Sequence, residues 1–166
     1  MSKGFSKYDY PPFDEWVWKS FDRKRKIELD EWIANNYLKE FFVGTDSQVY
    51  GNKTTFTTCL IAYEMGRGGT IVLHSDKTES FKDLRPRLLQ EAMRSVQAAW
   101  YLDERIPAKS NIAIHLDVNE SDPELNLRFK SGKYKEELVG LVIAQGFDCS
   151  YKPDSWASST VADRRC

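Results

Sequence analysis

The chain has 166 residues, of which 41% are hydrophobic and 30% are charged, a composition typical of a globular protein. Its net charge of −1 excludes a general electrostatic attraction to nucleic acid, so such binding would need a local basic surface. The three cysteines are odd in number and lack CxxC spacing, which argues against a disulfide framework or a zinc site. There is no apolar leader and no apolar run long enough to span a bilayer, so we expect a soluble, cytoplasmic protein without a membrane partner.

The N-terminal quarter is expected to form an arm and a helix, residues 1–40, that pack on a domain spanning residues 41–166. Two consecutive prolines cannot join a helix interior or a central strand, so residues 1–20 are predicted to be extended. Asp22 is predicted to cap a helix that runs to about Lys39, because apolar side chains recur on one stripe of this segment.

The rest of the chain alternates between strand and helix patterns. Strands are predicted where β-branched and aromatic residues cluster, over residues 41–48, 54–63, 70–74, 111–118 and 147–151. Helices are predicted from apolar spacing, beginning near Pro86 and ending near 104, then over 134–145 and 155–165. Short turns make the first three strands antiparallel, and helical crossovers make the later pairings parallel. The sequence therefore predicts an α/β fold, a mixed five-stranded sheet (three antiparallel strands plus two parallel) flanked by helices.

Four acids occupy positions where an apolar side chain would be energetically cheaper. Asp46 and Asp117 lie late in the first and fourth predicted strands, Glu91 shares a helix face with core leucines, and Asp163 lies in the last predicted helix. A single acid in such a place is more often solvated or salt-bridged, but one topology can bring all four together. Two carboxylates about 4 Å apart repel by about 4 kcal/mol at an effective dielectric constant of about 20. We therefore expect a divalent cation, Mg²⁺ or Mn²⁺, to hold them.

Short motifs accompany these acids: GTDSQ at residues 44–48, LRPRL at 84–88, HLDVN at 115–119 and KPDSWASS at 152–159. In combination they resemble the YkuK-type family of ribonuclease H-like proteins, and the resemblance covers the chain from about residue 41 onward. It implies a ribonuclease H-like fold with acids on the first strand, the first crossover helix, the end of the fourth strand and the last helix. By that resemblance the catalytic residues and metal ligands are Asp46, Glu91, Asp117 and Asp163.

Six further residues are candidates for contacts with substrate or with the metal ligands: Gln48, His115, Asn119, Arg85, Arg87 and Lys152. Each has a plainer interpretation. His115 is typical of a hydrogen-bonded core histidine, Gln48 and Asn119 suit turns, and the cations suit a solvated face or, if they cluster, a phosphate-binding rim.

The resemblance implies a metal-dependent nuclease that cuts RNA or DNA with two cations about 3.5–4 Å apart. The alternative is a non-catalytic module that keeps the fold and binds nucleic acid or protein. A third alternative is a phosphatase or nucleotide-hydrolysing activity at the same acids.

Overall fold

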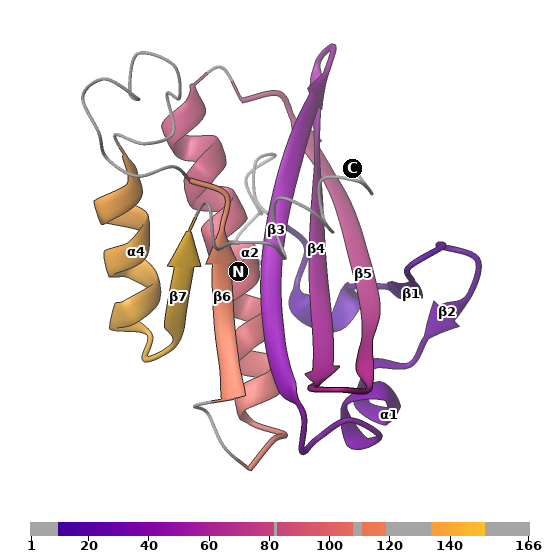
Figure 1. Ribbon diagram of the computed structural model, residues 1–166. Helices are drawn as coiled ribbons and strands as arrows, with labels where there is room; N and C mark the ends of the chain where they lie inside the picture. Colours follow the sequence, from indigo (N-terminus) through magenta and orange to yellow (C-terminus); the bar gives the residue numbers. More distant parts are fainter. Residues whose placement is uncertain (1–9, 82, 108–110, 119–133, 152–166) are drawn as a thin grey trace, which may run out of the picture.

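A seven-stranded mixed sheet organises the computed structural model, which describes residues 10–81, 83–107, 111–118 and 134–151 (Figure 1). The strand order is β2-β1-β5-β4-β3-β6-β7. The strands are β1 Trp18–Ser20, β2 Lys26–Ile27, β3 Glu40–Tyr50, β4 Lys53–Glu64, β5 Gly68–Glu79, β6 Ile112–Leu116 and β7 Asp148–Tyr151. The helices are η1 Phe13–Glu15, α1 Leu29–Ala34, α2 Leu84–Asp103 and α4 Lys135–Ala144.

The five central strands confirm the predicted fold class. Strands β3, β4 and β5 form the antiparallel meander, and β6 and β7 join it as parallel strands. The turn between β3 and β4 closes directly after the Tyr50–Lys53 pair, and Gly51 in it has a φ of 58°. Glycine adopts this left-handed conformation without a steric penalty, which suits Gly51 to this turn.

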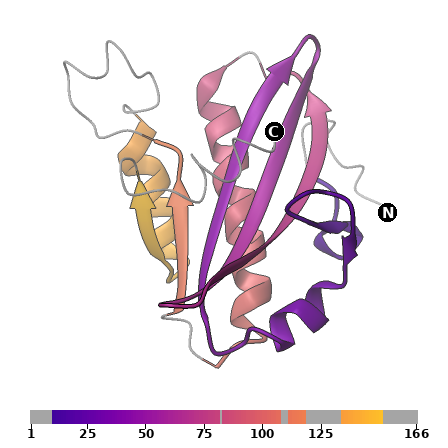
Figure 2. The ribbon, with the colours of Figure 1, turned by 45° about the vertical axis from the view of Figure 1, so that its right-hand side comes forward.

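The sheet has seven strands rather than five because part of the expected arm pairs with it. Strand β1 pairs antiparallel with β5 and with β2, so residues 18–27 form a hairpin at the edge of the sheet (Figure 2). Trp18 and Ser20 are buried and Lys19 is exposed, the alternation of a half-buried strand. Two strands this short carry too little alternation to be recognised in the sequence alone.

The predicted helix from Asp22 to Lys39 is wrong in its first half. The side chain of Asp22 instead accepts hydrogen bonds from the Ser20 hydroxyl at 2.6 Å and from the Lys24 amide at 3.0 Å, inside the hairpin turn. The helix α1 begins only at Leu29 and is capped by Glu28, which accepts from the amide of Glu31 at 2.7 Å.

Helix α2 covers one face of the sheet and contributes six buried residues to the main hydrophobic core. Its buried residues recur every three or four positions, and several are small, so the helix lies close to β3 and β6. Pro86 lies in its first turn, as predicted, where a missing backbone N–H is harmless. Helix α4 packs beside α2 on the same face. We call the opposite face the open face, since none of the helices in the described part of the chain lies on it (Figures 1 and 2).

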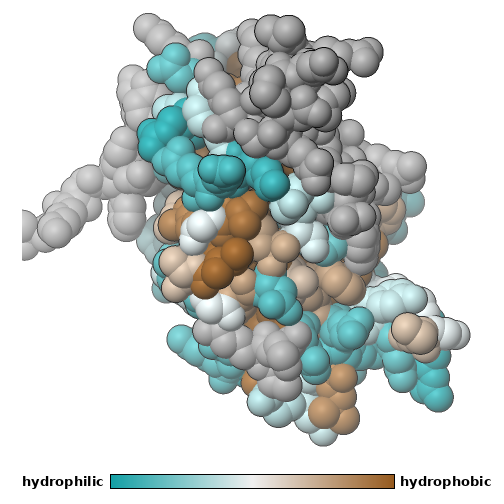
Figure 3. Space-filling model, turned by 60° about the vertical axis from the view of Figure 1, so that its left-hand side comes forward, coloured by the Kyte–Doolittle hydropathy of each residue, from teal (hydrophilic) through white to brown (hydrophobic). Residues whose placement is uncertain are grey.

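The outer surface of α4 changes along its length. Seen from the side of α4 and β7, hydrophilic surface gives way to a hydrophobic patch (Figure 3). On α4 itself, Ile143 is 59% exposed.

No helix within the described residues is both long and apolar enough to cross a membrane.

A buried ionic network connects α2 to β5 and to the chain before β1. Arg94 is fully buried and donates to the two carboxylate oxygens of Asp76, at 3.0 Å from Nε and 2.7 Å from Nη2. His74 Nε2 lies 3.6 Å from the same carboxylate, and its Nδ1 lies 3.1 Å from the carbonyl oxygen of Val17. Burial opposes ionisation of Asp76, but the neighbouring His74 and the hydrogen bonds and charge of Arg94 outweigh it and lower the pKa of this carboxyl.

Removing one member of this network should leave a buried charge without its partner. We expect Asp76→Ala to lower the free energy of unfolding by about 3–5 kcal/mol, measured by urea denaturation. The control is Glu64→Ala, which removes an exposed pair with Arg67 at 3.9 Å and should change stability by less than about 1 kcal/mol. Equal losses in the two variants would contradict a dominant role for the buried network.

Candidate functional site

The acids of β3 and β6 lie just beyond the point where these two strands stop pairing. The last parallel pair is Gly44 with His115, and Asp46 and Asp117 each follow two residues later. Side chains level with one another on parallel strands share a face, and the strands are about 4.8 Å apart where they pair. Asp46 is only 6% exposed, and Oδ1 of Asp117 is shielded from solvent. The end of the β3–β6 ladder therefore holds two neighbouring carboxylates, Asp46 buried and Asp117 partly buried.

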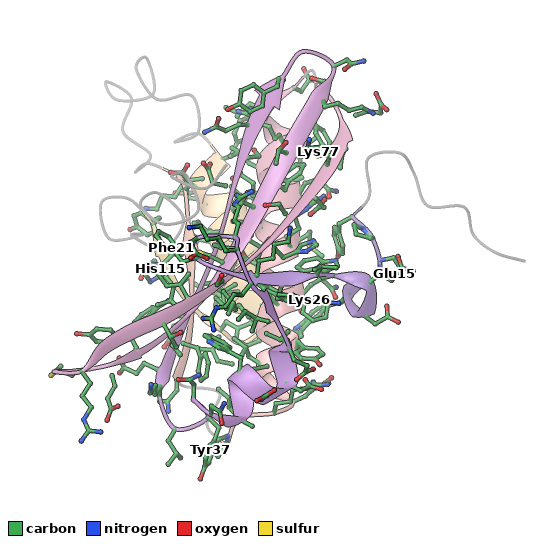
Figure 4. All side chains as sticks on the ribbon, turned by 90° about the vertical axis from the view of Figure 1, so that its right-hand side faces the viewer. Glu15, Phe21, Lys26, Tyr37, Lys77 and His115 are labelled. Carbon is green, nitrogen blue, oxygen red and sulfur yellow. The ribbon has the colours of Figure 1, made fainter. Side chains whose placement is uncertain are left out.

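The residues that flank Asp46 fix the direction of its side chain. The hydroxyls of Thr45 and Ser95 lie 2.8 Å apart, and the Ser47 hydroxyl donates to Glu91 at 2.5 Å, so Thr45 and Ser47 face α2. Successive strand residues point to opposite faces, which directs Asp46 to the open face. His115 lies on that face too, and Figure 4 shows it on the same side of the sheet as Phe21.

Glu91 reaches the site from α2 and is 7% exposed. Burial is the largest influence on this carboxyl and, with the negative charge of Asp117, raises its pKa to about 8. The hydrogen bond from Ser47 and the charges of Arg87 and Arg94 act in the opposite direction. Glu91 and Asp117 are therefore close enough to repel each other, although Glu91 belongs to the helix and Asp117 to a strand end.

The two arginines proposed as substrate contacts have different surroundings. Arg87 lies one turn before Glu91 on α2, and its Nε is buried without a hydrogen-bond partner among the described residues. Arg85 instead donates to both carboxylate oxygens of Glu137 on α4, an exposed ion pair. Arg87 is thus the arginine that faces the acids, while Arg85 links two helices.

The remaining predicted residues divide into those that are described and those that are not. His115 is 3% exposed and its ring lies 5.1 Å from that of Phe42, which fits a core histidine. Gln48 accepts a hydrogen bond from the Tyr50 hydroxyl. Outside the described residues lie Asp163, Asn119 and Lys152.

Across residues 10–81, 83–107, 111–118 and 134–151, no three acids, histidines or cysteines form a group that could hold a metal ion. The described residues place Glu91 within electrostatic reach of Asp117, and they place Asp46 at the same end of the β3–β6 ladder. Convergence of all four acids, and their catalytic and metal-binding roles, stay a prediction.

Sequence reasoning missed a set of buried hydroxyls under the acids. Thr45 is within 3.1 Å of Thr58 and 2.8 Å of Ser95, and Ser47 holds Glu91. The sequence feature that could have revealed them is the alternation of strand residues around Asp46, because it places both neighbours of this acid on the helix-covered face. The contact with Glu91 itself depends on how α2 packs on β3.

A mixed sheet of this strand order, with acids at the end of the ladder between β3 and β6, defines a ribonuclease H-like α/β protein. The chain belongs to the ribonuclease H-like family, whose model matches residues 27–166.

A curated relative is the uncharacterized protein YkuK of Bacillus subtilis (strain 168). It is 26% identical over 130 residues, which cover 74% of this chain and 76% of that protein. No solved structure matches the chain.

The raised pKa of Glu91 predicts how the stability of the metal-free protein depends on pH. The folded state holds the proton more tightly than the unfolded state, whose carboxyl has the ordinary pKa of 4.5. Its contribution to stability is therefore complete below that ordinary value and is lost as pH rises toward about 8. In a chelator, Glu91→Gln should flatten this decline and be more stable than wild type at about pH 9, as thermal denaturation between about pH 6 and about pH 9 would show. The exposed-site control is Glu137→Gln. If stability fell with pH as steeply in Glu91→Gln as in wild type and in this control, the raised pKa would not belong to Glu91.

Proposed function

We propose that this protein is a divalent-metal-dependent hydrolase of phosphodiester bonds in RNA or DNA. The observation that carries the proposal is that buried Glu91 is repelled by the negative charge of Asp117, at the end of the β3–β6 ladder where β3 presents Asp46. Buried carboxylates repel one another, and a bound cation relieves that repulsion. Membership of the ribonuclease H-like family also supports a metal-dependent hydrolase.

The donor set fits a hard cation. Asp46, Glu91 and Asp117 offer carboxylate oxygens, the ligands that Mg²⁺ and Mn²⁺ prefer. The Ser47 hydroxyl engages Oε1 of Glu91 and so fixes the orientation of this carboxylate. The resemblance adds Asp163 as a fourth ligand, which lies outside the described residues.

When bound, the metal supplies Lewis-acid stabilisation of the charge that develops on the phosphate. The chain's own groups would then position the substrate. Arg87 would hold its positive charge near the acids, where it attracts a phosphate electrostatically, and the burial of Glu91 keeps its carboxylate out of bulk water. Asp46, directed to the open face, is the acid that a nucleic acid lying on this face would meet.

A second candidate is a module that binds nucleic acid or protein without cutting it. The observation that favours it is that the described residues contain no group of three ligands for a metal ion. Under this alternative, the acids would bind divalent ions weakly and wild type would cleave none of the substrates.

Activity with Mg²⁺ or Mn²⁺ on single-stranded, duplex and hybrid substrates tests the nuclease. We expect Asp46→Asn and Glu91→Gln each to lower the rate of cleavage by about a hundredfold or more, since each removes a charged group from the reacting centre. Asp148→Asn, an exposed acid at the start of β7, should leave cleavage unchanged.

A second readout separates the two candidates without turnover. Mn²⁺ should raise the melting temperature of wild type, and it should do so much less in Asp46→Asn. Binding of nucleic acid with neither cleavage nor a metal-dependent gain in stability would establish the non-catalytic module instead.

A further inference from the structure

The β1–β2 hairpin carries a local concentration of positive charge in a chain whose net charge is −1. Between Trp18 and Ile27 there are five cations and one acid. The cations are all exposed, and none of them forms an ion pair within the part of the chain that the structure describes. They are Lys19, Arg23, Lys24, Arg25 and Lys26.

The acid in the hairpin serves the turn. Oδ1 of Asp22 accepts from the Ser20 hydroxyl and from the amide of Lys24, and the Ser20 hydroxyl in turn accepts from the amide of Arg25 at 3.1 Å. These bonds give the turn a defined shape and hold the cations on a rigid support. A rigid support reduces the entropy lost when the cations bind a partner.

Arg23 occupies a position that glycine would fill more easily. Its φ is 62°, and it is the one non-glycine residue with positive φ in the described chain. The left-handed conformation is strained for a side chain with a Cβ. Strain of this kind tends to persist where the side chain is needed for function.

The hairpin opens onto the same face as Asp46. Lys19 and Arg23 line a hollow of about 250 Å³ together with Ser75 of β5. The Ser75 hydroxyl lies 3.0 Å from that of Thr57, and Thr57 is the register partner of Asp46. Three strand spacings separate β1 from β3, so Lys19 and Asp46 are roughly 15 Å apart across the sheet. About four base pairs of duplex span this length.

We propose that the β1–β2 hairpin binds the phosphate backbone of a nucleic acid and holds it across the open face toward Asp46. Unpaired cations on a rigid turn match a polyanion whose charges are regularly spaced, and such contacts do not depend on base sequence. The choice of nucleic acid as the polyanion rests on the proposed nuclease function. An anionic lipid surface is disfavoured, because residues 18–27 expose no large hydrophobic side chain that could insert into it.

Binding without metal isolates the hairpin from catalysis. The fluorescence anisotropy of labelled single-stranded RNA and duplex DNA, each of about 24 nucleotides per strand, would be measured in chelator at increasing salt. Wild type would be compared with the fourfold variant R23Q/K24Q/R25Q/K26Q. We expect the variant to bind about tenfold or more weakly, with the salt slope reduced by about three.

Arg23→Gly separates charge from folding. Glycine relieves the strain at φ 62°, so this variant should melt at or above the temperature of wild type. It should nevertheless bind more weakly, with the salt slope reduced by about one. The double variant K53Q/R67Q removes two cations from other turns of the sheet and should bind like wild type.

Each outcome bears on the proposal. Unchanged affinity in the fourfold variant, an equal loss in K53Q/R67Q, or no binding by wild type would overturn it. Wild type that binds vesicles of phosphatidylserine and phosphatidylcholine but neither oligonucleotide would also overturn it and assign the hairpin to a lipid surface. If binding depends on the hairpin but wild type cleaves nothing in Mn²⁺, the hairpin proposal stands and the nuclease proposal fails. If wild type cleaves nucleic acid but the fourfold variant binds it as well as wild type does, the nuclease proposal stands and the hairpin proposal fails.

Discussion

The end of the parallel pairing between β3 and β6 is the constraint on which the site depends. Up to Gly44 and His115 the two strands share a hydrogen-bonded ladder, and the next side chains on this face are Asp46 and Asp117. Inside the ladder, two neighbouring acids would occupy positions that apolar side chains fill at lower cost in free energy. Beyond the end of the ladder, Asp46 and Asp117 are still neighbours, but their strands no longer pair. Glu91 can therefore approach them from α2. The result is a concentration of buried negative charge that is unfavourable unless protons or cations reduce it.

The rest of the molecule supports this arrangement from two directions. Ser47 fixes Glu91 from within β3, while Thr45 joins β3 to β4 and to α2 through hydroxyl contacts. Farther along α2, Arg94 binds Asp76 of β5. The helix that carries Glu91 is therefore anchored at successive turns to the central strands and to β5. We expect this anchoring to keep the position of Glu91 nearly constant when a ligand arrives.

The sequence predicted the central sheet well because alternation and short turns are local signals. It failed for β1 and β2, whose pairing depends on contact with β5 some fifty residues later in the chain. Asp22 was a plausible helix cap by residue type, but the same side chain suits a hairpin turn equally well, and only the tertiary pairing decides between them. Asp46, Glu91 and Asp117 were chosen from pattern and resemblance, and their roles in a site stay a prediction. That Ser47, and not Asp46, faces Glu91 follows from strand alternation only after the packing of α2 is known.

The most direct test is a crystal structure of the full chain grown with Mn²⁺ and measured at a wavelength where manganese scatters anomalously. Our account predicts anomalous density in contact with carboxylate oxygens of Asp46 and Asp117, with Glu91 turned toward the same ion. Carboxylates that remain apart and without density at saturating Mn²⁺ would contradict it, and the repulsion between Glu91 and Asp117 would then have a purely structural role.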